Sequence, residues 1–339
     1  MVKTFAVIGL GRMGYRTVLA GRAAGLELCS ILDSAETPWG VTQDAELAPF
    51  VVSAFDDMIA RGPDVVAIST TADSHYKLFN SLADAGIKTL LVEKPVACSV
   101  ADALAMAKRA DEDAMQVLVN HNHRAWSVLH KIRAFDGDPR FGTLKSFTIV
   151  QGAGGIGNLG THYFDLTNWM FAASPTQVVA FGTQPEAANP RGAQFLDLGG
   201  TVMAAYPDQR RLVLEIGDDV GVIGGYEFRY EFGRVLMPFT SEPPRVFIRK
   251  PETREMPKHF YGAALEELPW DGFVSGDVVV HTTKVFEDLL SGNRSSGATL
   301  RDAAKALEMT AAARLSIERN TIMTLPLQGD DVDRVFSLA

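Results

Sequence analysis

Two short stretches of the chain contain residues that could do chemistry. One stretch has glycines that suit a dinucleotide site, and the other has a lysine that can move a proton. Gly9-Leu10-Gly11-Arg12-Met13-Gly14 spaces three glycines so that the chain can turn tightly, approach a pyrophosphate and pack a helix on a strand, in that order. Glu93-Lys94-Pro95 follows the apolar run 89–92, where a strand of a parallel sheet is expected to end. A lysine beside a dinucleotide site predicts redox chemistry on a carbonyl or an alcohol.

An acidic residue downstream of the glycines bears on which dinucleotide binds. Asp33 follows a predicted strand at 26–32 and lies 24 residues beyond Gly9, the expected place of a carboxylate that binds the adenosine ribose hydroxyls. This carboxylate would repel a 2′-phosphate, which favours NAD over NADP. A helix that begins near Arg12 and Met13 would present its N-terminus to the pyrophosphate, so both residues are cofactor-binding candidates. A glycine-rich turn without a ligand is the alternative, against which the flanking strands and the acid argue.

The elements that must position these residues alternate between strand and helix. Apolar runs of strand length lie at 5–8, 26–32, 63–70, 89–92 and 115–119. Because helical stretches separate them, they predict an α/β fold with a doubly wound parallel Rossmann sheet over residues 1–122, the dinucleotide-binding domain. Ligands of such sheets bind at the carboxyl ends of the strands. The further candidates at that edge are Thr70, Thr71, His75, Glu93, Lys94 and Asn122.

Residues 73–86 are expected to form one of the helices of this domain. Asp73 or Ser74 can cap its N-terminus, and Gly86 suits its C-terminal end. His75 would lie in the first turn, where it either contacts the cofactor or is an ordinary exposed histidine. A later helix is expected to begin after Ser99, which opens a capping box.

A second group of polar residues follows a glycine-rich loop at 152–157. Asn158, His162, Asp165 and Trp169 are spaced four, three and four residues apart, which predicts that they share one face of a helix. Polar groups near a helix N-terminus beside a glycine loop are typical of a substrate-binding wall. A partly buried helix in which His162 bonds Asp165 for packing alone agrees equally well with the spacing.

Residues 123–339 are expected to form an α+β domain that binds substrate and forms oligomers. Aromatic and charged residues alternate with period two at 226–232, and weaker alternation follows at 211–216 and 245–249. These patterns predict a large open, mostly antiparallel sheet whose aromatic stripe belongs to the core. Its other face would meet solvent or a second subunit, so a homodimer or homotetramer is expected. Helices are expected at 278–290 and 300–319.

Composition excludes several classes of function. Hydrophobic residues make up 47% of the 339 residues and charged residues 22%, the balance of a soluble globular protein. The formal net charge of −9 and the lack of a basic tract argue against nucleic acid or membrane as a partner. The N-terminus is expected to be a strand, not a signal peptide, and no apolar run could span a bilayer. With only Cys29 and Cys98, we expect no disulfide framework, no metal site and a cytoplasmic location.

Together these motifs resemble the Gfo/Idh/MocA oxidoreductases, the family of glucose–fructose oxidoreductase and inositol dehydrogenase. The resemblance extends over nearly the whole chain. Its marks in the first part are the glycine motif, the acid after the second strand, the turn from Thr70 to His75 and, most specifically, Glu93-Lys94-Pro95. In the second part it continues through residues 160–165, Trp169 and the final helix with residues 311–316.

The resemblance implies a role for each matching residue. Lys94 would bond the substrate oxygen and help to move its proton, and His162 would be the catalytic acid or base. Asn158 stands where many members carry an aspartate, which can share a proton relay, whereas an asparagine can only hydrogen-bond. The Asn-x-Gly-x-His-x-x-Asp form is similar to that of members that oxidise the 3-hydroxyl of nucleotide-linked sugars. The expected substrate-binding residues are Asn158, Asp165, Arg124 and Asn122.

The expected reaction is reversible hydride transfer between C4 of nicotinamide and a carbinol carbon of a sugar, sugar nucleotide or cyclitol. The hydroxyl proton must leave as well, and a lysine suits this task if burial and nearby cations lower its pKa from about 10.4 toward neutrality. Asp165 would hold the imidazole tautomer of His162, and Glu93 would position Lys94 or the ribose. Arg124 would either bind substrate charge or pack between the domains.

Three other functions stay open at this point. A non-catalytic NAD(P)-binding sensor would keep the fold, although it would not need both Lys94 and His162. An oxidoreductase that retains its cofactor could shuttle between two sugars. An enzyme could also use tightly bound NAD transiently, for elimination or glycoside cleavage. The residues choose neither the substrate nor the direction of the reaction.

Overall fold

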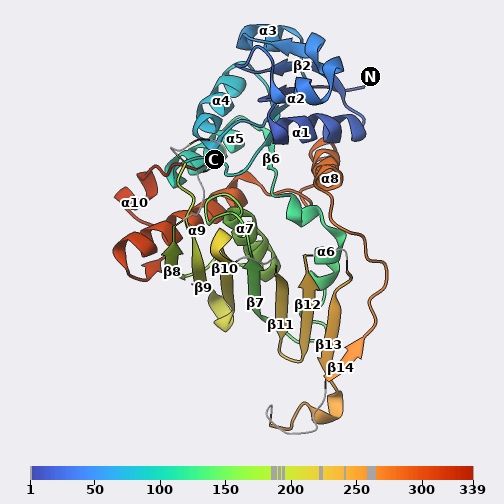
Figure 1. Ribbon diagram of the computed structural model, residues 1–339, viewed down its shortest axis with the longest axis vertical. Coiled ribbons are helices and arrows are strands. Elements are labelled where there is room, and N and C mark those ends of the chain that lie inside the picture. The colour runs from blue at the N-terminus through green and yellow to red at the C-terminus, as the bar shows by residue number, and fades with distance from the viewer. Residues whose placement is uncertain are drawn as a thin grey trace. The chain divides into compact units, whose positions relative to one another are not determined.

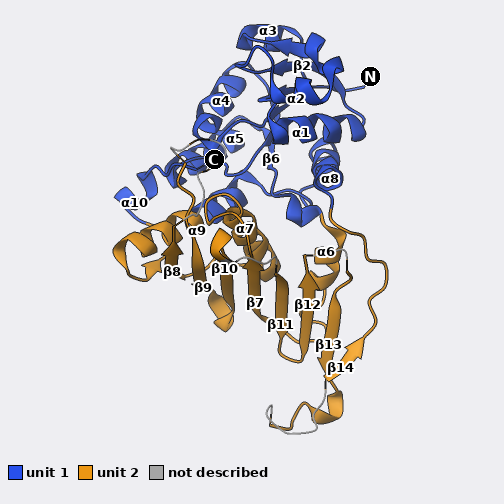
Figure 2. Cartoon of the chain, viewed as in Figure 1, with its two compact units in different colours: residues 1–125, 277–308, 328–339 blue, residues 126–276, 309–327 orange. Residues whose placement is uncertain are grey.

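The computed structural model describes residues 2–184, 189, 192, 195–220, 224–239, 242–257 and 265–338. The chain folds into two compact units, which are coloured separately in Figure 2. Unit 1 contains residues 1–125, 277–308 and 328–339, and unit 2 contains residues 126–276 and 309–327. Within the described ranges, no helix has the length and apolar character that crossing a bilayer requires.

Unit 1 is built on six parallel strands in the order β3-β2-β1-β4-β5-β6. The chain passes from β1 outward to β3, and then from β4 outward to β6 on the other side, so the strand order reverses between β1 and β4. The predicted doubly wound sheet is confirmed. Its strands are β1 Thr4–Ile8, β2 Glu27–Leu32, β3 Val51–Val52, β4 Val65–Ile68, β5 Thr89–Val92 and β6 Gln116–Val119.

The helices of unit 1 begin largely where the capping residues indicate. Helix α1 begins at Arg12 as predicted, and Ser99 caps α5 by accepting a hydrogen bond from the Asp102 N–H. The expected cap of α4 is wrong, because Thr71 is its N-cap residue and the Ser74 hydroxyl instead donates to the Thr71 carbonyl. The helical segments are α1 Arg12–Ala23, α2 Trp39–Gln43, α3 Phe55–Ala60, α4 Ala72–Asp84, α5 Val100–Glu112, α8 Val278–Ser291 and α10 Asp330–Asp333, with 3-10 turns η1 Ala45–Phe50 and η2 Asn122–Ala125.

Helix α8 packs with the first part of the chain although it lies late in the sequence. Its Phe286 meets Phe5 of β1 edge to face, and the Thr283 hydroxyl donates to the Ala20 carbonyl of α1. In Figure 1, α8 accordingly lies beside α1. The chain end belongs to the same unit, because the Phe336 N–H donates to the Cys98 carbonyl. Unit 1 therefore extends beyond residue 122, whereas the functional division into two domains remains a prediction.

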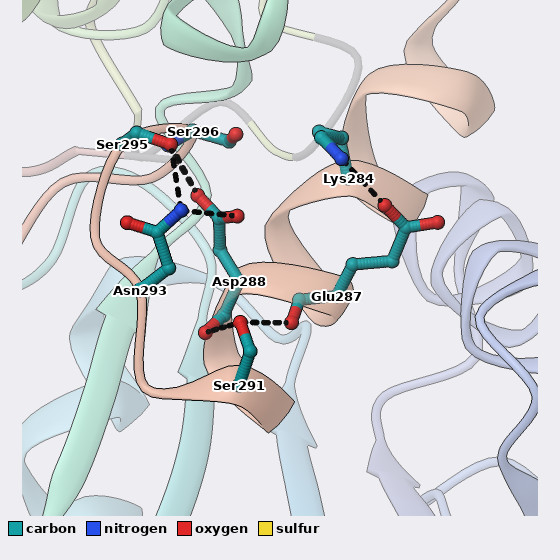
Figure 3. A network of polar contacts seen from close by, with 7 residues as sticks. All are labelled: Lys284, Glu287, Asp288, Ser291, Asn293, Ser295 and Ser296. Atoms are coloured by element: carbon teal, nitrogen blue, oxygen red, sulfur yellow. Dashed lines mark hydrogen bonds and ion pairs between the residues drawn. The ribbon is translucent and has the colours of Figure 1, made fainter.

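A buried carboxylate fixes the segment that follows α8. Asp288 is only 3% exposed and accepts hydrogen bonds from Asn293, from the Ser295 hydroxyl and from the Ser296 N–H (Figure 3). Burial by itself raises the pKa of Asp288, but the hydrogen bonds from Ser296 and Ser295 outweigh it and keep the pKa below its usual value. This network ties residues 293–296 to the last turn of α8.

Unit 2 is built on a nine-stranded sheet in the order β14-β13-β12-β11-β7-β10-β9-β8-β15 (Figure 1). Only the β7–β10 pair is parallel among these described strands, so the predicted mostly antiparallel sheet is confirmed. Its strands are β7 Leu144–Gln151, β8 Gln177–Thr183, β9 Gly199–Ala205, β10 Arg211–Ile216, β11 Gly225–Tyr230, β12 Gly233–Pro238, β13 Arg245–Arg249, β14 Leu265–Leu268 and β15 Met323–Thr324.

The aromatic stripe of β11 lies in the core of unit 2, as predicted. Phe228 is fully buried and stacks on Phe147 of β7, with ring centroids 4.3 Å apart. Tyr226 meets Tyr163 of helix α7 edge to face, so this side of the sheet packs on the helix. The helical segments of unit 2 are α6 Ser127–Arg133, α7 Gly160–Phe171, η3 Pro207–Gln209, η4 Asp218–Val220 and η5 Pro251–Thr253. Helix α9 Leu300–Arg319 belongs to unit 1 up to residue 308 and to unit 2 from residue 309.

Candidate active site

The glycine turn between β1 and α1 has the geometry that its sequence predicts. Gly9 adopts a φ of +87°, which favours glycine, and its N–H donates to the Leu32 carbonyl of β2. A side chain at Gly14 is excluded for a different reason, since its Cβ would lie 1.8 Å from the Gly9 carbonyl oxygen. The first turn of α1 thus packs directly on the turn that precedes it.

Gly11 is the glycine that leaves room for a ligand. Its φ of −71° is ordinary, yet a Cβ placed there would meet no protein atom within 4 Å. Arg12 and Met13 follow in the first turn of α1, where backbone N–H groups lack partners within the helix and the helix dipole is positive. Open space above a helix N-terminus fits the pyrophosphate of a dinucleotide.

Asp33 is fixed beside this space by the glycine turn itself. One carboxylate oxygen accepts from the Leu10 N–H at 2.7 Å, and the other accepts from the Ala35 N–H at 2.8 Å. Each oxygen retains acceptor capacity, because an ionised carboxylate offers about four lone-pair sites. The half-buried Asp33 can therefore hold the turn and still accept the hydroxyls of a ribose.

His75 connects two loops at the carboxyl edge of the sheet. Its ring is 0% exposed, with Nε2 lying 3.1 Å from the Thr70 carbonyl oxygen and Nδ1 3.0 Å from that of Pro95. Burial lowers the pKa of His75, although the backbone contacts oppose that shift. The histidine is thus buried rather than exposed, and it ties the loop after β4 to the loop that contains Lys94. Contact of His75, Thr70 or Thr71 with a cofactor stays a prediction.

Lys94 follows β5 at the same edge, after a buried carboxylate. Glu93 is 5% exposed, and its side chain accepts from the Asn120 amide at 2.6 Å and from the Lys94 N–H at 3.3 Å. Lys94 itself is half-buried. Asn120 directly follows β6, so the rule that located Glu93 and Lys94 could have located it as well.

Several cationic or potentially cationic groups surround this edge in unit 1. Burial, the Arg124 charge and the Lys94 charge lower the pKa of His121 well below its usual value. Burial together with His281, His121 and Lys94 lowers the pKa of His123 to about 3, although the side chain of His123 keeps some exposed surface. Both histidines are therefore neutral at physiological pH. The sequence pattern did not single out these histidines, and His281 comes from α8.

Arg124 lies in an ion pair within unit 1. The guanidinium donates to Asp302 at 3.3 Å, and only 7% of the arginine side chain is exposed. Asp302 also forms the reciprocal capping box of α9 with Thr299. Part of the Arg124 charge thus stabilises the start of α9. Contact of Arg124 or of the buried Asn122 with a substrate stays a prediction.

The glycine loop of unit 2 is held by carboxylates from other elements. Asp197 accepts from the N–H groups of Gly157 and Asn158 at 2.6 and 3.0 Å, and Asp218 accepts from the Gly154 N–H. The φ of Gly155 is not positive, so its backbone does not require glycine. A Cβ there would lie 2.4 Å from the Asp197 carboxylate, and this close approach explains why the position is a glycine. Asp197 was not anticipated, because nothing in its local sequence connects it to a loop 40 residues earlier.

Helix α7 carries the remaining candidates, with one correction. The helix begins at Gly160, so Asn158 lies in the preceding turn and does not share a helical face with the others. His162 and Asp165 lie one turn apart in α7 and are 8% and 1% exposed. Except for Trp169, every residue of α7 is buried, so His162 and Asp165 are held in a packed environment. Among the described residues, no group of His, Cys, Asp or Glu side chains has the arrangement of a metal site.

The sequence of this chain is similar to a known protein family and to curated proteins. Residues 3–121 match the model of the Gfo/Idh/MocA family, an oxidoreductase family with an NAD-binding Rossmann fold. A myo-inositol dehydrogenase from Streptomyces leeuwenhoekii is 24% identical over 202 residues, which cover 55% of this chain and 62% of that protein. The oxidoreductase YteT of Bacillus subtilis is 26% identical over 165 residues, or 41% of this chain and 37% of that protein. The chain therefore spans less than two thirds of the length of these curated relatives.

Solved structures share the fold over nearly the full chain. A levoglucosan dehydrogenase in complex with NADH and levoglucosan superposes with a TM-score of 0.77 at 17% identity, covering 96% of this chain and 100% of that one. The UDP-N-acetylglucosamine 3-dehydrogenase of Acidithiobacillus ferrooxidans gives 0.74 at 18% identity, with 94% and 98% covered. Identities this low establish the fold alone. With its parallel sheet, its glycine turn and the match over residues 3–121, the N-terminal part of this chain carries the NAD-binding Rossmann fold of the Gfo/Idh/MocA family of oxidoreductases.

Proposed function

We propose that the protein is an NAD-dependent oxidoreductase that acts on a ring hydroxyl or ketone of a sugar, sugar nucleotide or cyclitol. The observation that carries the proposal is the open space at Gly11, at the N-terminus of α1, with the Asp33 carboxylate held beside it. The match of residues 3–121 to an oxidoreductase family model supports the reaction class. When bound, the nicotinamide ring supplies the hydride acceptor or donor at C4.

Lys94 is proposed as the residue that handles the substrate oxygen. Its place after β5 puts it at the carboxyl edge of the sheet, where ligands of this fold bind. As an ammonium group it would donate a hydrogen bond to the alkoxide that develops during oxidation. As an amine it would accept the hydroxyl proton, so one side chain can serve both directions of the reaction.

His162 is proposed as the catalytic acid or base, with Asp165 as the group that holds its tautomer. A histidine in a packed helix keeps one ring orientation, and a carboxylate three residues later lies on the same side of the helix. Asn158, in the turn before α7, would hydrogen-bond the substrate without exchanging a proton. These roles follow the resemblance between the 158–165 segment and the family.

NAD is the proposed cofactor in preference to NADP. Asp33 presents a carboxylate whose orientation is already fixed by Leu10 and Ala35. Ribose hydroxyls can donate to it, whereas a 2′-phosphate would bring a second negative charge against it. The NAD-binding description of the family and the NADH complex of the levoglucosan dehydrogenase support this choice.

The substrate class is supported by what the similar proteins are named for. Myo-inositol, levoglucosan and UDP-N-acetylglucosamine all carry a polyhydroxylated ring. The form of the 158–165 segment, with asparagine in place of aspartate, favours the nucleotide-linked sugar among them. A first substrate panel should therefore contain nucleotide sugars, free sugars and cyclitols.

The test is a screen of this panel with purified protein and NAD, read by nicotinamide absorbance and by product analysis. The proposal predicts net NADH formation with at least one ring alcohol. Product without a net change in absorbance would instead indicate transient use of bound NAD, or a shuttle between two sugars if a second sugar is reduced. Bound NAD without turnover of any compound would indicate a sensor and contradict the proposed function.

We also propose that the protein is a homodimer or homotetramer. Phe181 of β8 and Met203 of β9 lie on the sheet face that does not carry the aromatic stripe, and they are 64% and 46% exposed. Large apolar side chains on an open sheet face favour a subunit contact. Sedimentation equilibrium of the wild type and of a Phe181→Glu variant tests this, and a monomeric wild type would contradict it.

A further inference from the structure

A chain of buried polar side chains leads from α8 to the backbone of Lys94. The Thr282 hydroxyl, 0% exposed, accepts from the amides of Asn122 at 3.4 Å and Asn120 at 3.3 Å. The Asn120 amide also donates to one carboxylate oxygen of Glu93 at 2.6 Å. The other Glu93 oxygen accepts from the Lys94 N–H at 3.3 Å.

These buried side chains cannot change hydrogen-bond partners without a large cost in free energy. Asn120 is 1% exposed, and its own N–H is paired with the Val92 carbonyl of β5, so its side chain starts from a fixed point. A buried polar group that loses its hydrogen-bond partner destabilises the fold by its full desolvation penalty. The Asn120 amide nitrogen is therefore held between the Thr282 hydroxyl and one Glu93 oxygen, which leaves the other Glu93 oxygen to the Lys94 N–H.

We propose that Thr282 and Asn120 are positioning residues for Lys94, acting through Glu93. The proposal rests on the proposed role of Lys94 in handling the substrate oxygen. An amine that must meet a substrate oxygen loses rate steeply when its backbone shifts, because catalysis depends on near-ideal geometry. Cofactor binding at the Gly11 turn, on a different loop, should be left intact.

The variant Thr282→Val tests the proposal by removing the hydroxyl with little change of shape. Thr282→Ser keeps the hydroxyl and serves as the rescue. Thr283→Val is the matched control, because its hydroxyl lies on the same helix but donates to the carbonyls of Val279 and Ala20. Asn120→Ser is a second route to the same effect, since a serine side chain is too short to keep the contact with Glu93.

Two readouts distinguish positioning from a merely structural role. We expect Thr282→Val to lower kcat about tenfold, equivalent to about 1.4 kcal/mol, while KM for NAD changes less than twofold. Backbone amide exchange in the segment 92–97 should accelerate in Thr282→Val and Asn120→Ser, but not in Thr282→Ser or Thr283→Val. The double variant Thr282→Val/Asn120→Ser should lose no more activity than the worse single variant, because both substitutions interrupt the same series of hydrogen bonds.

The outcomes separate this proposal from the proposed function. If the wild type turns over a substrate and Thr282→Val keeps both its kcat and its amide exchange, the positioning role is wrong. Additive losses in the double variant would overturn it equally. If the wild type shows no turnover at all, the proposed function fails, whereas the exchange rates at 92–97 still decide whether the chain from Thr282 orders the Lys94 backbone.

Discussion

Replacing Gly11 with alanine should separate cofactor binding from folding. Its φ of −71° and ψ of −165° are accessible to alanine, and the new Cβ would meet no protein atom within 4 Å. A compatible Gly→Ala change stabilises a fold by about 0.4–1 kcal/mol, because it restricts the unfolded chain. A methyl group forced against a ligand costs about 1–3 kcal/mol, so the affinity for NAD should fall about 5- to 150-fold.

The assay pairs calorimetric titration with NAD and urea unfolding of the same preparations. Gly14→Ala is the matched contrast, because its Cβ would lie 1.8 Å from the Gly9 carbonyl and should destabilise the fold by at least about 3 kcal/mol. Wild-type NAD affinity in a stable Gly11→Ala protein would refute the placement of the pyrophosphate. Loss of stability in Gly11→Ala would refute the reading of open space at this turn.

Two further predictions concern charge. Asp33→Asn should shift the ratio of NAD to NADP affinity at least about tenfold toward NADP. The substitution removes the charge that repels a 2′-phosphate, while the asparagine oxygen can still accept a hydrogen bond from the turn. An unchanged ratio would show that another group selects the cofactor. Burial lowers the pKa of His75 and of His121, so below pH about 6.5 the unfolded chain binds protons that the folded chain does not, and stability falls as the pH falls. For His123, whose pKa falls to about 3, the loss between pH 7 and 5.5 is about 1.3 kcal/mol. Urea unfolding at the two pH values should show at least this loss, because His75 and His121 act in the same direction, and a His121→Gln variant should lose less than the wild type.

Local patterns predicted the parts of the fold that depend on local physics. The start of α1 at Arg12 follows from the glycine motif, and α8 and α9 begin at the predicted residues because Asp277 and Thr299 cap them. The buried stripe of β11 follows from its alternation of aromatic and charged residues. These features need only neighbours within a few positions.

Features that depend on distant residues escaped the sequence pattern. Asn158 was placed in a helix by its spacing, but Asp197 captures its N–H and that of Gly157 and holds both in a turn before α7. Thr282 accepts a hydrogen bond from Asn120, which lies 162 residues earlier in the sequence. No local pattern marks a threonine on an apolar helix as part of a buried hydrogen-bond network. The burial of His75 is not visible in the local sequence either, because the Pro95 carbonyl that Nδ1 contacts lies 20 residues away.

The central claim is that Lys94 handles the substrate oxygen while the Gly11 turn holds the cofactor. The most direct test compares Lys94→Met with Lys88→Met, an exposed lysine just before the opposite end of the same strand β5. We expect Lys94→Met to bind NAD within about threefold of the wild type and to lose about a thousandfold in kcat, and Lys88→Met to retain both. A Lys94→Met protein that keeps its kcat within tenfold of the wild type would contradict the account.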